Sequence, residues 1–119
     1  MADGIKGWAR LARATRVSYV GLGWALRSEE AFRIELALCV LLVPAALWLG
    51  QSGVERAMLV MSLFIVLITE LLNTAVEVVV DRIGSEWNEL SGRAKDLGSA
   101  AVHLGVVQVP VVWGLVLLS

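Results

Sequence analysis

Four polar residues recur along one face of a predicted helix in the second half of the chain. The stretch ITELLNTAVEVVVDR, residues 68–82, is apolar except for a few positions, among them Glu70, Asn73, Glu77 and Asp81. At about 100° per residue, these four fall on a single stripe. Carboxylates can hold a divalent cation together with substrate phosphates, or accept a proton from a hydroxyl. Because an acid at the centre of a transmembrane helix costs about 2.5 to 3.5 kcal/mol, the stripe is a functional hypothesis.

The two glutamates of this stripe lie at different depths. Counting about twenty residues of span from Ala57 leaves Glu77 near the membrane boundary and Glu70 roughly 10 Å deeper. One small ion cannot bridge them, so a second metal ligand is expected from Glu29 or Glu30, which precede the first apolar run. Glu70 could instead act as a general base for a hydroxyl among lipid tails. The alternative interpretation is a hydrogen-bonding stripe that only holds an oligomer together.

The composition indicates a membrane protein. Of the 119 residues, 58% are hydrophobic, and the mean hydropathy is +0.77. Ten basic residues against eleven acidic ones give no general affinity for nucleic acid. Cys39 is the only cysteine, and its apolar neighbours predict a buried, unreactive thiol.

The elements expected to position the acidic stripe are all helical. Residues 5–27 predict an amphipathic surface helix, with apolar side chains such as Trp8 and Leu11 on one side and arginines on the other. Apolar runs at 34–49, 57–80 and 97–119 predict three transmembrane helices within a single membrane domain covering residues 1–119. A tight turn at 50–53 and a polar connection at 82–96 join the spans. Small residues in the third span predict close helix packing and oligomerisation: Ala94, Gly98, Ala101 and Gly105.

The flanking cations predict the orientation of these helices. Arginine and lysine gather in the N-terminal segment and in the polar connection, whereas the turn after the first span is followed only by Arg56. The positive-inside rule therefore places the N-terminus and the polar connection in the cytoplasm. The cytoplasmic end of the acidic stripe then faces the side of the membrane that contains ATP.

The polar connection contains no GxxxxGK[ST] or GxGxxG pattern, which argues against a P-loop or a protein-kinase site. The sequence ELLNTAVEVVVDRIGSEWNELSGRAKDLGSAAV, together with the upstream EEAFRIE, resembles the signature of the prokaryotic diacylglycerol kinase family. The resemblance covers nearly the whole chain without gaps. It implies an all-α integral membrane homotrimer with active sites shared between subunits. The implied reaction uses Mg²⁺ and ATP to convert diacylglycerol to phosphatidic acid in the bacterial cytoplasmic (inner) membrane.

The resemblance also implies residue roles. Glu70 matches the family's catalytic base, and Glu29 and Glu77 match its metal-holding pair. The ATP-binding positions implied in this way are Arg10, Glu29, Glu77, Glu86, Trp87, Asn88, Lys95 and Asp96. The lipid-binding positions, expected in a groove between the surface helix and the spans, are Arg10, Ala14, Ser18, Arg33, Glu35, Trp48, Glu70, Ser99 and Trp113.

Several positions leave alternatives open. Val17 and Gly23 stand where family members often have an aromatic residue and an arginine. Trp48 and Trp113 could equally be interfacial belt residues. The remaining polar residues of the third span, His103 and Gln108, favour interhelical hydrogen bonding over catalysis.

Three other functions are compatible with parts of the sequence. The acceptor could be undecaprenol, which some relatives use. A small proton-coupled transporter also carries a lone intramembrane glutamate, but it predicts four spans and no use of ATP. A non-catalytic scaffold would assemble without any need for Glu70.

Overall fold

The computed structural model describes residues 7–119, which form four helices. These are α1 (Gly7–Ser28), α2 (Glu30–Leu49), α3 (Gly53–Ile83) and α4 (Glu89–Leu117). The described residues contain no strand, so the predicted all-α fold is confirmed. Residues 5 and 6 of the predicted surface helix lie outside the described part of the chain.

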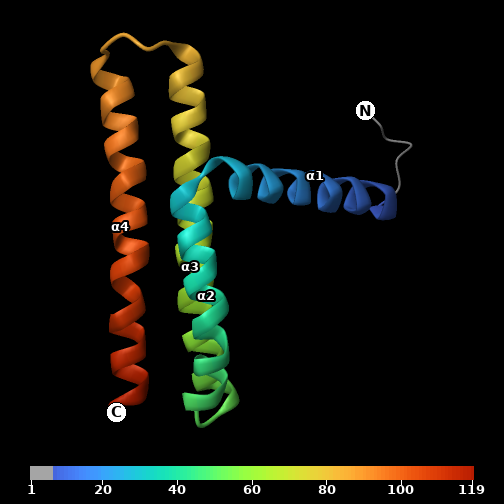
Figure 1. Cartoon of the computed structure of the whole chain (residues 1–119), viewed down its shortest axis with the longest axis vertical. Coiled ribbons are helices and arrows are strands. Elements are labelled where there is room, and N and C mark those ends of the chain that lie inside the picture. The colour runs from blue at the N-terminus through green and yellow to red at the C-terminus, as the bar shows by residue number, and fades with distance from the viewer. Residues whose placement is uncertain (1–6) are drawn as a thin grey trace.

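Helix α3 is the centre of the subunit. Both α2 and α4 pack along it, whereas α1 contacts α2 and leaves its start at a steep angle. In Figure 1 the α3–α4 hairpin continues well beyond the level at which α1 branches off. The chain therefore forms a bundle of three helices, in which α3 runs antiparallel to α2 and α4, and α1 projects from the side of this bundle.

Helices α2, α3 and α4 are each long and apolar enough to cross a membrane, which confirms the three predicted spans. Their outer faces carry large apolar side chains that the subunit does not cover. Leu41 is 71% exposed, Phe64 56% and Leu104 68%. Such a surface requires lipid or another subunit around it.

The connection between α3 and α4 is shorter than the sequence predicted. Helix α3 runs to Ile83 and α4 begins at Glu89, so the polar residues 89–96 are helical rather than part of a loop. The cause is a helix cap at Asn88, whose side-chain Oδ1 accepts hydrogen bonds from the backbone N–H groups of Leu90 and Ser91 at 2.9 and 3.1 Å. Hydropathy alone did not reveal this helix start.

Two glycines let α4 approach α3 closely, as predicted from the small residues of this span. Gly98 lies against the Asn73 side chain, and a Cβ built on Gly105 would lie 2.6 Å from the Thr69 hydroxyl oxygen. Both glycines are buried, whereas Ala101 is exposed on another face of α4. The glycines therefore set the spacing of the hairpin.

Hydrogen bonds fix the register of the same two helices. The amide nitrogen Nε2 of Gln108 donates to the backbone oxygen of Ser62 at 2.7 Å and to that of Gly105 at 2.8 Å. The indole N–H of Trp113 donates to the buried Ser62 hydroxyl at 2.9 Å. Gln108 thus has the interhelical role that the sequence favoured.

We expect Gly105→Ala to destabilise the folded subunit by about 1 to 3 kcal/mol, because the added methyl group overpacks the contact with Thr69. The matched control is Gly114→Ala on the same helix, where nothing lies within 4 Å of the built Cβ. That control should be neutral or slightly stabilising, since alanine favours helix. Thermal unfolding in detergent measures both variants. Equal midpoints for the two would contradict this account of the α3–α4 contact.

Candidate active site

The acidic stripe of α3 runs from the buried middle of the helix to its exposed end. Glu70 is only 6% exposed, Asn73 and Glu77 are half-buried, and Asp81 is exposed. The stripe thus joins the interior of the bundle to the polar end of the hairpin. The difference in membrane depth between Glu70 and Glu77 stays a prediction.

A second carboxyl group meets Glu70 from α2. The side chains of Glu35 and Glu70 lie close together, and Oε1 of Glu35 is buried without a hydrogen-bond partner. Two carboxyl groups in contact cannot both be ionised without strong repulsion, so the pair is suited to hold a proton. The buried Oε1 leaves an acceptor available to a ligand hydroxyl.

Two more carboxylates complete the cluster. Glu29, directly before α2, and Glu77, two turns along α3, are both close enough to repel the charge on Glu70. Both side chains are half-buried. We call these four residues the carboxylate cluster: Glu29, Glu35, Glu70 and Glu77.

The described residues contain no group of three or more side chains of the kind that holds a metal by itself. Mg²⁺ needs no such cage, because it is usually held by one or two carboxylates together with substrate phosphates and water. Glu29 and Glu77 flank Glu70 from two helices and are partly open to solvent, which suits that mode of binding. The residues present therefore fit a cation that arrives with a phosphate ligand.

Arg33 fixes the junction that places Glu29 and Glu35. Its guanidinium Nη1 donates to the backbone oxygens of Leu26 at 2.9 Å and Arg27 at 3.3 Å, in the last turn of α1. These carbonyls have no partner within the helix, and a cation there also complements the helix dipole. A residue that the sequence associated with lipid thus also caps α1.

The nucleotide positions implied by resemblance fall into two groups in the structure. At the start of α4, the Lys95 ammonium bonds to the Asp81 carboxylate at 2.9 Å and also lies within electrostatic range of Glu77. Asp81, at the exposed end of the acidic stripe, is thus engaged in an ion pair. Trp87 and Asp96 line one hollow of about 280 Å³ next to Lys95, while Glu86 is exposed in the preceding loop. Asn88 is the cap described above.

The second group of nucleotide positions consists of Arg10 alone. It lies in the first turn of α1, eighteen residues before Ser28 and therefore about 27 Å from the junction with α2. Figure 1 shows this end of α1 pointing away from the bundle. A single subunit does not bring Arg10 to the carboxylate cluster.

The predicted lipid positions are also dispersed. Trp48 is 83% exposed near the end of α2, about 20 Å along the helix from Glu35. Trp113 is held to Ser62 near the same end of the bundle. The exposed remainder lies on α1 and α4: Ala14, Ser18 and Ser99.

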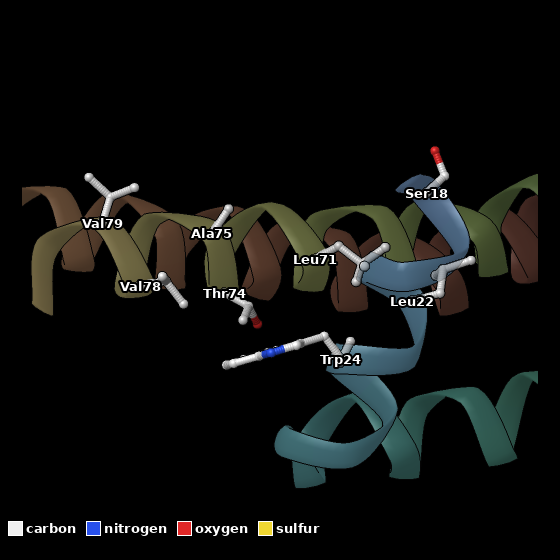
Figure 2. A pocket seen from close by; sticks show the side chains of 10 residues that line it. Ser18, Leu22, Trp24, Leu71, Thr74, Ala75, Val78 and Val79 are labelled. Atoms are coloured by element: carbon white, nitrogen blue, oxygen red, sulfur yellow. The ribbon is translucent and has the colours of Figure 1, made fainter. Parts of the chain in front are cut away.

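A groove of about 720 Å³ does open between α1 and α3. Figure 2 shows the Trp24 ring beside Thr74 and the Leu22 side chain beside Leu71, while the Ser18 hydroxyl points outward. The walls are almost entirely apolar. Among the implied lipid positions, only Ser18 lines this groove.

Fold and site together define a small helical membrane protein with a carboxylate cluster inside its bundle and a charged hairpin, carrying both acidic and basic residues, at one end. The profile of the family described as "Prokaryotic diacylglycerol kinase" matches residues 16–117. The chain belongs to this family, as its sequence predicted.

Individual relatives agree with this assignment over their full lengths. The chain is 44% identical to "Diacylglycerol kinase" of Escherichia coli (strain K12), with 100% of this chain and 98% of the relative aligned. It is 46% identical to the protein of that name from Haemophilus influenzae, covering 91% and 92%. For the Pseudomonas aeruginosa protein of that name, the identity is 42%, covering 98% and 94%.

Reasoning from the residues alone missed the role of Glu35, which entered only as a lipid contact implied by resemblance. A partial signal was available, because Glu35 is an acid at the start of the predicted span 34–49, although the cost argument used for Glu70 is weaker at the edge of a span. Asn73 was placed on the stripe, but its buried and unpartnered Oδ1 beside Gly98 was not foreseen.

We expect Arg33→Met to loosen the junction between α1 and α2 by about 1 to 2 kcal/mol, because it removes a cation from the last carbonyls of α1. Hydrogen exchange of the amides in residues 22–28 should become faster. Arg13→Met, on the exposed surface of the same helix, is the control and should leave this exchange unchanged. Equal exchange in both variants would show that the cap does not hold the junction.

Proposed function

We propose that the chain catalyses transfer of the γ-phosphoryl group of ATP to the free hydroxyl of diacylglycerol, giving phosphatidic acid. The observation that carries this proposal is the buried Glu70 carboxyl group, in contact with Glu35, inside a chain of the prokaryotic diacylglycerol kinase family. The enzyme is a diacylglycerol kinase. An acid at this depth is suited to a substrate whose hydroxyl lies among lipid tails.

Glu70 acts as the general base in this proposal. As the glycerol oxygen attacks the γ-phosphorus, the bond from that phosphorus to the bridging oxygen of ADP breaks, and the hydroxyl proton moves to a Glu70 oxygen. Glu70 is buried inside the spans, where the hydroxyl of a lipid would lie, so its carboxylate is placed to accept that proton. The remaining catalysis consists of positioning and charge neutralisation.

Glu29 and Glu77 hold Mg²⁺ together with the nucleotide phosphates. The cation, when bound, neutralises phosphate charge. The other nucleotide contacts are proposed at Arg10, Glu86, Trp87, Asn88, Lys95 and Asp96. Lys95 supports this most directly, because its ammonium lies near Glu77 and only a carboxylate on an exposed turn engages it.

The active form is proposed to be a homotrimer with shared active sites. The separation of Arg10 from the carboxylate cluster supports sharing, because a neighbouring subunit could supply the guanidinium that its own chain cannot. The exposed apolar faces of α2, α3 and α4 support assembly. Each subunit is proposed to be one membrane domain in the bacterial inner membrane.

The N-terminus and the α3–α4 hairpin are proposed to face the cytoplasm, because they carry most of the cations. The lipid is proposed to contact Arg10, Ala14, Ser18, Arg33, Glu35, Trp48, Ser99 and Trp113 as well as Glu70. The transporter interpretation is disfavoured, since residues 7–119 contain three candidate spans rather than four.

We expect Glu70→Gln to keep the fold and the affinity for MgATP but to lower the rate of lipid phosphorylation about 10²- to 10⁴-fold, because glutamine cannot accept the proton. Rates with labelled ATP and MgATP affinity by calorimetry measure the two effects separately. A variant that phosphorylates at the parent rate would eliminate Glu70 as the base.

Glu77→Gln is expected to raise the Mg²⁺ concentration needed for half-maximal activity by about tenfold, because one of two carboxylate ligands is lost. Glu55→Gln, at the opposite end of α3, is the matched control and should leave this concentration unchanged. Magnesium titrations at saturating lipid give the comparison. An unchanged requirement in Glu77→Gln would place the metal elsewhere.

A further inference from the structure

His103 is the one ionisable side chain of α4 between Asp96 and the end of that helix. Unlike Gln108, it makes no hydrogen bond to any other group within residues 7–119. Its side chain is exposed on the subunit surface, yet it lies in the middle of a candidate span. Ionisable side chains in spans usually face a polar partner or a cavity, because contact with lipid is costly. His103 therefore needs a polar partner from outside the subunit.

Contacts between α3 and α4 place His103 level with Glu70. Gly98 of α4 lies against Asn73, and Gly105 lies against Thr69. Residue 103 comes between these two glycines on α4, and residue 70 comes between their two partners on α3. The imidazole and the Glu70 carboxyl group are therefore at about the same height in the bundle.

His103 also lies on the face of α4 that borders the opening between α2 and α4. It shares this face with Val106 and Pro110, because residues three and seven apart lie on one side of an α-helix. Val106 and Pro110 line a hollow in the opening together with Glu35 and Leu42 of α2. Helices α2 and α4 run in the same direction, so the residues seven positions before Leu42 and Pro110 lie at one height. These residues are Glu35 and His103, on the two sides of the opening.

The groups around this opening differ in what they can donate. Under the proposed function the lipid hydroxyl lies at Glu70, so the ester groups next to it on the glycerol backbone lie in the same opening. An ester carbonyl is only an acceptor, and an ionised carboxylate cannot donate to it. The thiol of Cys39 is directed to the backbone oxygen of Leu63. The imidazole of His103 carries at least one N–H group in either protonation state, so it can serve as the donor.

We propose that His103 is a specificity-determining residue, whose ring N–H donates a hydrogen bond to an ester carbonyl of the bound diacylglycerol. This inference rests on the proposed function and adds to it the group that distinguishes an ester lipid from an alcohol without esters, such as a prenol. Ser99, one turn nearer the hairpin on the same face of α4, is already among the proposed lipid positions. His103 continues this row to the depth of the base.

The ring of His103 can be observed selectively, because it is the only histidine of the chain. The full-length protein is labelled with ¹⁵N-histidine, purified with a histidine-free tag and studied by NMR in maltoside micelles without ATP. The two probes are dioleoylglycerol and the matching dioleyl ether, which has the same hydroxyl but no carbonyl. We expect the ester lipid to shift the ring nitrogen resonances and the ether lipid to leave them unchanged. Equal shifts from both lipids, or none from either, would overturn the proposal.

Substitutions test the same contact during turnover. His103→Leu should lower kcat/KM for the ester lipid about three- to tenfold, as expected for the loss of one hydrogen bond, and change kcat/KM for the ether lipid by less than about twofold. His103→Gln keeps an N–H donor and should retain most of the preference for the ester. The control is Leu104→Ala, because residue 104 is 68% exposed and is rotated by about 100° to another face. It should leave the ester-to-ether ratio unchanged. A loss in His103→Leu that is equal for the two lipids would contradict the proposal.

The outcomes separate this inference from the proposed function. If the parent protein phosphorylates no glycerolipid, the proposed function fails, yet the labelled ring still reports whether an ester lipid binds beside it. If the parent phosphorylates both lipids and His103→Leu keeps the parent ratio, only the role of His103 is wrong. If His103→Leu instead dissociates the oligomer, as measured by chromatography in detergent, the histidine is a subunit contact and the ester assignment is wrong.

Discussion

Repulsion among acids inside an apolar bundle is the constraint around which this subunit is arranged. Glu35 and Glu70 meet inside the spans, and Glu29 and Glu77 add their charges from nearby. Burying one acid at such a depth costs a few kcal/mol of free energy. Apolar packing around a carboxylate does not offset that cost. A cluster of this kind persists when it performs chemistry. Three of its side chains come from α2 and α3, and the fourth, Glu29, directly precedes α2, so the packing of α2 against α3 determines the site.

The remaining interactions position that pair of helices. Arg33 ties the end of α1 to the start of α2, which sets where Glu29 and Glu35 lie. On the other side, Gln108 and Trp113 hold α4 to α3 near Ser62, and the buried glycines let the two backbones approach. Lys95 then meets the exposed end of the acidic stripe. The contacts between α3 and α4, far from the cluster, therefore determine that Lys95 lies beside Asp81.

Features that depend on the periodicity of a single helix, or on the length of an apolar run, could be predicted from the sequence. The stripe of Glu70 and Glu77, the three spans and the turn after α2 all follow from such local patterns. The start of α4 did not, because residues 89–96 are polar enough to resemble a loop, and the cap at Asn88 makes them helical. The contact between Glu35 and Glu70 could not be predicted in this way, since it depends on the axial register of two helices.

The surroundings of two further residues could be known only from the folded chain. The expected place of Trp113 at lipid or at the interface stays a prediction, and its indole in addition donates to Ser62 across the hairpin. Arg10 resembles a phosphate ligand in sequence, yet its helix carries it away from the cluster of its own chain. In both cases the residue type was informative about chemistry, and only the fold determined the partner.

We propose that this carboxylate cluster catalyses transfer of the γ-phosphoryl group of ATP to a glycerolipid hydroxyl within the membrane. The most direct measurement is transfer of label from γ-labelled ATP by the purified protein in vesicles that contain dioleoylglycerol and undecaprenol, with and without Mg²⁺. We expect labelled phosphatidic acid only when Mg²⁺ is present. Label that appears in undecaprenyl phosphate alone, or in no lipid at all, would contradict it.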